Sequence, residues 1–350
     1  MTPRASTTKN NRFATLTEEL LVVLDARSKD VIVRRYGLKT GEKETLESIG
    51  KEYGITRERV RQIESQAKKV LSTRLDILKP AMESIEGIFK EEGGILLKER
   101  IAQLVQQKIS TDILSTVVHF YLEIVPPYLF VTTSPDFAPH WRHPDYVVAA
   151  AEEVVKVGTM ILHKAKHPLA EKDFLTEIAD QLKNQASEVH TTAWLLASRH
   201  MRKNPFGEWG LIGWSEVTPR GVGDKAYAVL RRHGKPEHFR SIADLINNAH
   251  FDRKQANAQT VHNELIKDDR FVLVGRGLYG LTEWGFVPGT VADVLESVLK
   301  KSQQALSREE LIEQVLSQRL VKKNTILLSL QDQSRFVKTQ ENRYTLKEKS

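Results

Sequence analysis

Residues 45–71 combine two helix-starting threonines with one turn glycine, and this spacing constrains the fold more than any other feature of the 350-residue chain. Thr45 and Thr56 can each cap the N-terminus of a helix by accepting a hydrogen bond from a backbone N–H. Gly54 lies between them and can take the positive φ of a tight turn, while Ile55 can fill the gap between the two helices. Two helices joined by a short glycine turn form a helix-turn-helix, which we predict here.

The second helix of this pair has two separate faces when its residues are placed at 100° intervals. Its apolar residues fall between about 220° and 320°, and its polar residues between 0° and about 140°. Arg can bridge guanine, Gln can bridge adenine, Glu can accept from cytosine, and Lys neutralises phosphate. The pattern therefore predicts a DNA-reading helix, with an ordinary amphipathic surface helix as the alternative. The apolar set is Val60, Ile63, Ala67, Val70 and Leu71, and the polar set is Arg57, Glu58, Arg61, Gln62, Ser65, Lys68 and Lys69.

The excess positive charge of the chain lies in its first quarter. Residues 1–80 hold 17 Lys and Arg against 11 Asp and Glu, out of 52 and 45 in the whole chain. The remainder holds 35 basic and 34 acidic side chains and is nearly neutral. A basic module on a neutral body indicates a polyanionic partner, most commonly nucleic acid, although a solvated basic surface has the same composition. We expect residues 81–350 not to bind DNA strongly through phosphates alone.

Upstream of the helix-turn-helix, residues 24–38 add a helix with an apolar stripe and a basic face. The stripe is Leu24, Val31, Ile32 and Tyr36, and the cations are Arg27, Lys29, Arg34 and Arg35. Followed by T-L-E-S-I-G-K-E-Y-G-I-T-R-E-R-V-R-Q-I-E, this stretch closely resembles region four of bacterial primary-type sigma factors, over about residues 16–75. In that family the domain reads the −35 promoter element and touches the flap of RNA polymerase. The resemblance therefore implies double-stranded promoter-like DNA and RNA polymerase as partners.

The resemblance also implies roles for individual residues. Arg57, Glu58 and Gln62 match the base-reading positions of the recognition helix. Arg59 and Arg61 match cations that serve the DNA backbone or neighbouring proteins. We predict that these two arginines, the two capping threonines and four other cations contact the DNA backbone. These are Arg34, Arg35, Thr45, Thr56, Arg59, Arg61, Lys68 and Lys69.

The position of this domain in the chain differs from that in a working sigma factor. A sigma factor has its polymerase-clamp and −10-reading regions N-terminal to it, whereas about 20 residues precede it here. We therefore expect that the chain cannot start transcription as a sole sigma factor.

Two C-terminal stretches, residues 259–284 and 324–348, share one spacing. An arginine follows a threonine by ten positions and a tyrosine follows the arginine by nine, in Thr260, Arg270 and Tyr279 and again in Thr325, Arg335 and Tyr344. Each stretch follows a helical pattern and itself reads as helix, strand, polar turn and strand, which is the order of a winged helix. Weaker copies run over residues 172–214 and 95–141.

Residues 226–285, which include the first of these stretches, carry a signature of packing and turn positions. The signature is Phe239, Ile242, Thr260, Val261, Leu265, Asp269, Arg270, Phe271, Gly275, Gly277, Tyr279, Gly280 and Leu281. With it, residues 226–285 resemble the HARE-type winged-helix domain, which also occurs in the delta subunit of bacterial RNA polymerase and in eukaryotic chromatin regulators. Members are thought to contact DNA or polymerase, and the resemblance implies the fold more closely than the function.

Residues 275–280, G-R-G-L-Y-G, match a dinucleotide-binding fingerprint. That site needs a helix to begin at the glycines, whereas L-T-E-W-G follows and favours a strand and a stop. We interpret the glycines as the turn of a wing. Arg276 at its tip is a candidate phosphate contact, and a solvated loop cation is an equal alternative.

The sequence shows no signal for catalysis or metal binding. The absence of cysteine excludes disulfides, thiolate zinc sites and iron–sulfur clusters. His163 with His167, and His140 with His143, have spacings that could begin a metal site, but solvated or capping histidines are the favoured interpretation. We expect no catalytic residue, cofactor, metal or small-molecule substrate, and no signal peptide or membrane span, hence a cytoplasmic protein.

These observations predict a mainly α chain, in which a helix-turn-helix precedes several small winged-helix modules. We expect it to be a non-enzymatic, DNA-binding transcription regulator or a sigma-like accessory factor of RNA polymerase. The alternative is an architectural or scaffold protein whose winged helices bind protein partners. The expected segments are a flexible arm (1–15), the sigma-like helix-turn-helix (16–80), a helical or winged-helix-like module (81–145), a winged-helix-like module (146–217), the HARE-type winged helix (218–288) and a last winged-helix-like module (289–350).

Overall fold

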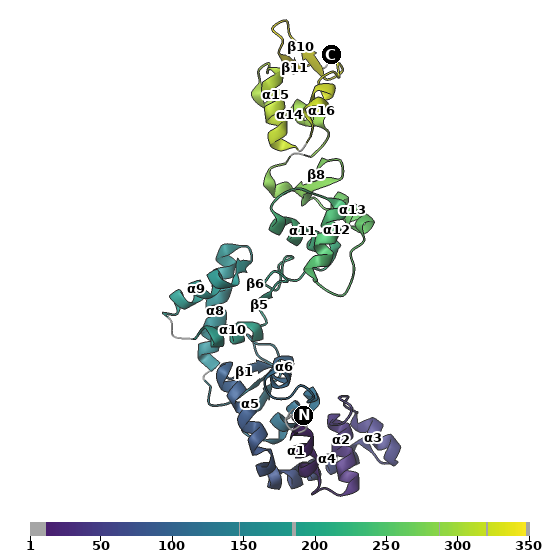
Figure 1. Ribbon diagram of the computed structural model, residues 1–350, viewed down its shortest axis with the longest axis vertical. Coiled ribbons are helices and arrows are strands. Elements are labelled where there is room, and N and C mark those ends of the chain that lie inside the picture. The colour runs from purple at the N-terminus through teal and green to yellow at the C-terminus, as the bar shows by residue number, and fades with distance from the viewer. Residues whose placement is uncertain (1–11, 147, 184–186, 287, 320, 348–350) are drawn as a thin grey trace, which may run out of the picture. The chain divides into compact units, whose positions relative to one another are not determined.

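Figure 1 shows the computed structural model, which describes residues 12–146, 148–183, 187–286, 288–319 and 321–347. The chain divides into two compact units, unit 1 (Met1–Arg202) and unit 2 (Lys203–Ser350). The described residues are mainly helical, and small antiparallel sheets follow the helices. The predicted fold class, a mainly α chain with winged-helix modules, is confirmed.

The N-terminal helices of unit 1 form the predicted helix-turn-helix. They are α1 (Arg12–Leu21), α2 (Ala26–Tyr36), α3 (Leu46–Tyr53) and α4 (Arg57–Leu71). Thr45 caps α3 by accepting from Ser48 N at 3.1 Å, and Thr56 caps α4 by accepting from Arg59 N at 3.2 Å. Gly54 ends α3 with a φ of 63°, a left-handed conformation that favours glycine.

The predicted flexible arm differs from the structure where it can be compared. Residues 1–11 lie outside the described residues, but residues 12–15 form the first turn of α1. The reason is Phe13, which is buried with its ring centroid 6.0 Å from that of Tyr121. Thr17 adds a 2.8 Å hydrogen bond to the Tyr121 hydroxyl, so α1 is fixed to a helix one hundred residues later in the chain.

A first winged-helix module follows in unit 1. A 3₁₀ helix, η1 (Ser72–Leu78), leads into α5 (Lys79–Glu91), β1 (Ile95–Leu97), α6 (Lys98–Lys108), α7 (Ser115–Ile124), β2 (Leu129–Val131) and β3 (His140–Arg142). The three strands are antiparallel in the order β1-β3-β2, with Trp141 opposite both Leu96 and Phe130.

This module and the helix-turn-helix share one hydrophobic core. Residues 116–122 of α7 are all buried, because V-V-H-F-Y-L leaves the helix no polar face. Phe120 packs 4.8 Å from the ring of Tyr36 on α2, and the same cluster contains Leu71 of α4. The boundary we expected between residues 80 and 81 therefore does not separate two cores.

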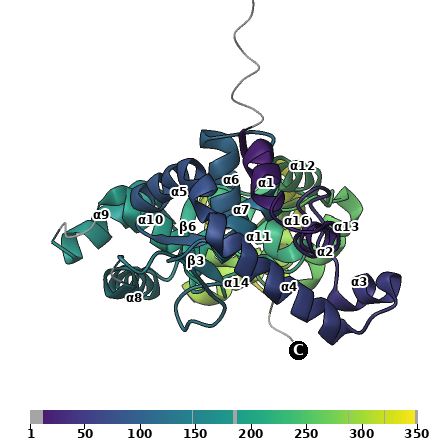
Figure 2. The ribbon, with the colours of Figure 1, turned by 90° about the horizontal axis from the view of Figure 1, so that it is seen from below.

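The N-terminal half of α4 lies outside this shared core. Val60 joins Val31 and Ile49 in a small second cluster, with Ile55 packed against it as the sequence predicted. Figure 2 shows α3 at the edge of unit 1, on the side away from α5, with α4 beside it.

The second winged-helix module is held against the first. Its elements are α8 (Val148–Ala165), β4 (Leu169–Ala170), α9 (Glu171–Gln181), α10 (Glu188–Ala197), β5 (Met201–Lys203) and β6 (Glu208–Leu211), the last of which belongs to unit 2. Trp194 on α10 donates to the carbonyl of Gly93, just before β1, at 2.9 Å. A Cβ on Gly93 would lie 2.7 Å from the Trp194 nitrogen, so this approach requires glycine.

Unit 2 contains the HARE-like winged helix. It has α11 (Val222–His233), β7 (Glu237–His238), α12 (Phe239–Ala249), α13 (Ala258–Lys267), β8 (Phe271–Gly275), β9 (Leu278–Leu281) and η2 (Thr282–Trp284). The strand order is β7-β9-β8. Gly277 turns the chain with a φ of 68°, and β9 follows it. No helix begins at these glycines, in agreement with the predicted wing.

The last module has the same order of elements. It consists of α14 (Val291–Ser302), α15 (Arg308–Gln318), α16 (Lys323–Ser329), β10 (Phe336–Lys338) and β11 (Tyr344–Leu346), and Leu306 supplies a single bridge to Tyr344. Arg319, between α15 and α16, is buried and donates to the carbonyls of Leu273 at 2.5 Å and of Gly289. Arg319 therefore ties this module to strand β8 of the preceding one.

The shared core leads to a prediction about cooperativity. Phe120→Ala should lower the free energy of unfolding of unit 1 by about 3–5 kcal/mol, the usual range for a buried aromatic. Because α4 packs in the same core, its amide protection from hydrogen exchange should fall together with that of α7.

Phe271→Ala is the matched control, since Phe271 is buried in the core of unit 2. It should destabilise the HARE-like module and leave α4 protection unchanged. If Phe120→Ala exposes α7 amides while α4 stays fully protected, the two modules do not fold together.

Candidate nucleic-acid interface

The first two turns of α4 carry the predicted base-reading residues on an exposed face. Arg57, Glu58 and Gln62 are all exposed, and the intervening Val60 is fully buried. The Thr56 cap fixes where the helix begins, so these three side chains lie at the end that a recognition helix inserts into the major groove. The structure brings them together on one surface.

Two of these side chains have intrahelical partners. Glu58 accepts from Arg61 at 2.7 and 2.9 Å, and Gln62 accepts from Arg59 at 3.0 Å. The hydrogen bond from Arg61 lowers the pKa of Glu58 and raises that of Arg61. Both pairs are exposed, and exposed pairs contribute little, so base edges and phosphates can replace them. Glu58 remains an ionised acceptor.

The Arg34 side chain forms hydrogen bonds within the protein. Its guanidinium donates to Glu44 through Nε and Nη2, both at 2.8 Å, and to Glu52 at 2.5 Å. The hydrogen bonds to Glu44 and then Glu52 raise the Arg34 pKa. The arginine holds α2 to α3 and to the loop before it. This arrangement does not support the backbone contact that we predicted for Arg34.

A buried hydroxyl joins the middle of α4 to α7. The Tyr36 hydroxyl oxygen lies 2.7 Å from a carboxylate oxygen of Glu64 and 2.8 Å from one of Glu123, so these two acceptors share its single hydrogen. Lys68 donates to Glu123 at 2.7 Å. The ammonium groups of Lys43 and Lys68 lie 5.4 and 5.1 Å from the Tyr36 ring centroid. We call these five residues the Tyr36 cluster.

The Tyr36 cluster has an electrostatic consequence. Burial, reinforced by the two carboxylates, raises the Tyr36 pKa, so the tyrosine remains a hydrogen-bond donor. Burial favours protonation of Glu123, but the hydrogen bonds from Lys68 and Tyr36 outweigh it and lower the pKa. The Lys68 ammonium group is therefore paired with the ionised carboxylate of Glu123 and does not point freely into solvent. Nothing in the sequence pattern indicated a role for Glu64 or Glu123.

The remaining predicted backbone residues differ in availability. Arg35 donates to the carbonyl of Glu44 at 3.0 Å and lies 3.8 Å from Glu64. Thr45 and Thr56 use their hydroxyl oxygens as cap acceptors, and each keeps a hydroxyl hydrogen that can be donated to a phosphate. Within the described part of the chain, Arg57 and Lys69 form no salt bridge. Arg276 is exposed at the wing turn of unit 2.

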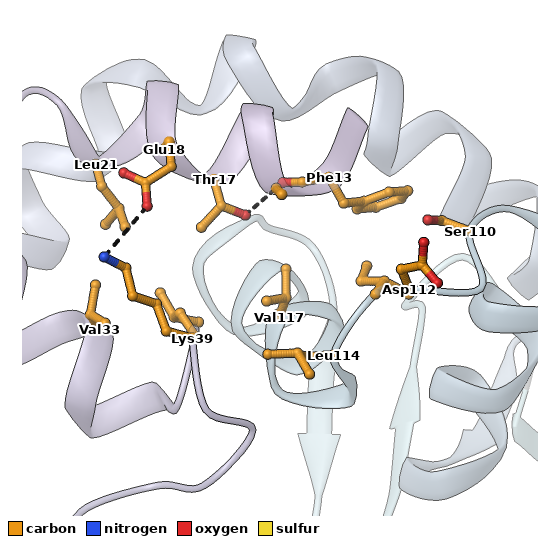
Figure 3. Close-up of a pocket in the computed structure, with 13 residues that line it drawn as sticks. Phe13, Thr17, Glu18, Leu21, Val33, Lys39, Ser110, Asp112, Leu114 and Val117 are labelled. Carbon is orange, nitrogen blue, oxygen red and sulfur yellow. Dashed lines mark hydrogen bonds and ion pairs between the residues drawn. The ribbon is translucent and has the colours of Figure 1, made fainter. Parts of the chain in front are cut away.

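A cavity of about 580 Å³ lies between α1, α2 and the segment that joins α6 to α7 (Figure 3). Its lining includes Glu18 and Lys39, whose charged atoms are 3.9 Å apart, together with Asp112. No predicted DNA-contacting residue lines it, so it is separate from the reading surface.

The histidine pairs form no metal site in the part of the chain that the structure describes. No group of three or more His, Asp or Glu side chains there could hold a metal ion. His163 and His167 are exposed around the end of α8, whereas a ring nitrogen of the buried His140 lies 2.8 Å from the Ala138 carbonyl oxygen. None of the helices in the described residues has the length and apolar character needed to cross a bilayer.

Comparison with known families identifies two domains in the chain. Residues 20–72 match the family described as Sigma-70, region 4. Residues 222–284 match the family HARE-HTH, whose description names a helix-turn-helix domain of ASXL and restriction endonuclease proteins. The chain therefore carries a Sigma-70 region 4 near its N-terminus and a HARE-HTH domain in unit 2. Both are helix-turn-helix domains of a kind that binds DNA, and neither is a catalytic family.

Similarity to three RNA polymerase sigma factors extends over a short stretch of the chain. The RNA polymerase sigma factor RpoS of Coxiella burnetii is 44% identical over 69 residues, which are 20% of each chain. The RNA polymerase principal sigma factor HrdD is 48% identical over 50 residues in both Streptomyces coelicolor and Streptomyces viridifaciens, which is 14% of this chain and 15% of each relative. The chain thus spans a fifth or less of the length of these curated relatives.

The Tyr36 cluster supports a prediction about stability. Tyr36→Phe should lower the free energy of unfolding of unit 1 by about 1–3 kcal/mol, because the carboxylates of Glu64 and Glu123 lose the hydrogen-bond donor that they share. Denaturant unfolding followed by hydrogen exchange in α4 measures this effect.

Tyr53→Phe provides the comparison, since Tyr53 also donates to a carboxylate, that of Asp30 at 2.8 Å, from a less buried position. It should cost less than about 1 kcal/mol. Equal losses in the two variants would contradict a special role for the cluster.

Proposed function

We propose that this protein is a DNA-binding transcription regulator, or a sigma-like accessory factor of RNA polymerase, that reads promoter-like double-stranded DNA through α4. The observation that carries the proposal is the capped, exposed N-terminal half of α4, with Arg57, Glu58 and Gln62 on one face. The match of residues 20–72 to Sigma-70 region 4 supports the same surface.

The proposed roles follow from chemistry and availability. Arg57, Glu58 and Gln62 read base edges, because these side chains offer the donors and acceptors that base pairs present in the major groove. Arg34 is left out, since its guanidinium already binds Glu44 and Glu52. Phosphates are contacted by the exposed or partly paired residues Arg35, Thr45, Thr56, Arg59, Arg61, Lys68 and Lys69, and in unit 2 by Arg276.

RNA polymerase is the proposed protein partner. The support is indirect, from the relatives that share this domain, which are named as RNA polymerase sigma factors. Co-purification of core RNA polymerase with the tagged full chain tests it. A scaffold protein, the alternative, would bind protein partners but show no salt-dependent affinity for duplex DNA.

Reading by α4 predicts that base preference is lost on substitution. Selection from a randomised duplex library should yield a preferred site for the full chain. Arg57→Ala or Gln62→Ala should weaken binding to that site by roughly 1–3 kcal/mol and relax preference at one position, since a bidentate base contact is removed.

Lys69→Ala is the matched control, because Lys69 is an exposed cation on the same helix. It should weaken binding to all duplexes similarly, through loss of a phosphate contact. If Arg57→Ala changes neither affinity nor preference, α4 is not the reading helix.

The Tyr36 cluster predicts that Glu123 restrains Lys68. Glu123→Gln keeps the side-chain shape but removes the charge that Lys68 faces at 2.7 Å. Affinity for any duplex should rise by roughly 2- to 10-fold at low salt, because Lys68 then keeps only its longer, 3.5 Å pair with Glu64 and can neutralise phosphate more readily.

Glu91→Gln controls for net charge, since Glu91 pairs with Lys108 elsewhere in unit 1. An equal rise in both variants would show that only overall charge matters and that Lys68 does not approach DNA.

A further inference from the structure

The third helix of each winged-helix module is the second helix of its helix-turn-helix, which is the one that can enter a DNA groove. In the first module this helix is α7, buried along residues 116–122. In the second it is α10, which packs beside β1 and is anchored by Trp194. The α7 helix is therefore enclosed along most of its length, and the exposed first turn of α10 carries Glu188 and no lysine or arginine.

The two modules of unit 2 present this helix differently. In the HARE-HTH domain, α13 buries only Val261 and Leu265. In the last module, which neither family match covers, α16 buries only Ile326. Lys322, Lys323, Asn324 and Thr325 at its start are all exposed, and so is Leu328, with 66% of its surface accessible.

Charge follows the same division. Residues 81–145 hold 5 basic and 9 acidic side chains, and residues 146–217 hold 8 and 9. Residues 218–288 and 289–350 each hold 11 basic and 8 acidic side chains, a net charge of +3 apiece. Residues 81–350 are therefore nearly neutral because the charges of two kinds of module cancel. The two acidic modules bury more of their third helix than the two basic modules do. Positive charge is thus unevenly distributed over residues 81–350, and the two modules of unit 2 carry the excess.

Many cations of the last module serve its fold. Arg335 pairs with Asp293 at 2.6 Å, Lys300 with Glu296 at 2.7 Å, Arg343 with Glu310 at 3.8 Å, and Arg319 is buried against carbonyls. By contrast, Lys322, Lys323 and Lys338 form no salt bridge with any described residue. The first two begin α16, and Lys338 ends strand β10 of the hairpin.

The hairpin adds a second positive feature. A hollow of about 740 Å³ is bounded by the end of α16 and by both strands, and its charged lining residues are Lys338 and Lys347. The start of α16 and the hairpin thus each offer lysines that form no salt bridge with a described residue. Such lysines suit a polyanion with regularly spaced charge.

We propose that residues 289–347 form a second DNA-binding module, which contacts the phosphates of duplex DNA through Lys322 and Lys323 at the start of α16 and through Lys338 on the hairpin. Binding is tolerant of sequence, because phosphate contacts carry no base information. This binding does not depend on base reading by α4. Because both surfaces belong to one chain, the module adds affinity to any site that α4 selects.

The test compares two charge-neutralising double variants of the full chain. Lys322→Gln/Lys323→Gln alters the proposed surface, and Lys300→Gln/Lys301→Gln alters the same number of charges on α14 of the same module. Affinity for a random-sequence duplex and for the site preferred by the protein is measured across a salt titration that brackets about 0.1 M. Circular dichroism confirms that the variants fold.

Neutralising two phosphate contacts should lower the magnitude of the salt slope by about 2 and weaken binding at about 0.1 M salt by roughly 5- to 50-fold. Lys338→Gln should lower the slope by about 1. The α14 variant should change the slope by less than half as much, and the ratio between preferred and random duplex should persist in every variant.

Equal effects of the two double variants would overturn the proposal, because net charge alone would explain them. An unchanged slope in Lys322→Gln/Lys323→Gln would also overturn it and would leave α16 as a surface for an acidic protein. Loss of base preference would come only from substitutions in α4, so failure here is distinguishable from failure of the proposed function.

Discussion

The structure of unit 1 depends on the burial of α7 on all sides. A helix that reads V-V-H-F-Y-L has no face to offer to water, and one small winged helix cannot enclose it. The α1, α2 and α4 helices supply the missing cover, with Phe13, Tyr36 and Leu71 in the shared cluster. We expected the helix-turn-helix to fold as a separate domain, but its helices form one side of a larger core.

This arrangement divides α4 into two parts with different tasks. Its last turns belong to the shared core, and its middle is tied to α7 by the Tyr36 cluster. Its first turns lie beyond that core on the small cluster of Val31, Ile49 and Val60. The buried part of α4 therefore holds its exposed first turns at a fixed angle. Under the proposed function, this limits the conformational freedom that DNA binding would otherwise have to remove.

Sequence reasoning succeeded where signals are local. The caps of α3 and α4 and the Gly54 turn act within four residues, so the helix-turn-helix could be located from residues 45–71. It failed where partners are distant. Lys68 lies on the polar side of the helical wheel, but nothing in the pattern shows that this side faces Glu123, 55 positions away. The winged-helix order could be predicted because apolar positions repeat, whereas surface charge varies between modules without disturbing the fold.

The shared core has a consequence for anyone who would exchange the reading head. A Sigma-70 region 4 transplanted from another protein would have to present a flat apolar surface where Phe120 meets Tyr36, and a hydroxyl where Glu123 accepts a hydrogen bond. A transplanted domain with a charged or bulkier residue at position 36 would disrupt the packing of α7. The transplanted domain would then lose the core that supports it. Under the proposed function, base preference would be changed by substitutions at the tip of α4 and not by replacement of the whole domain.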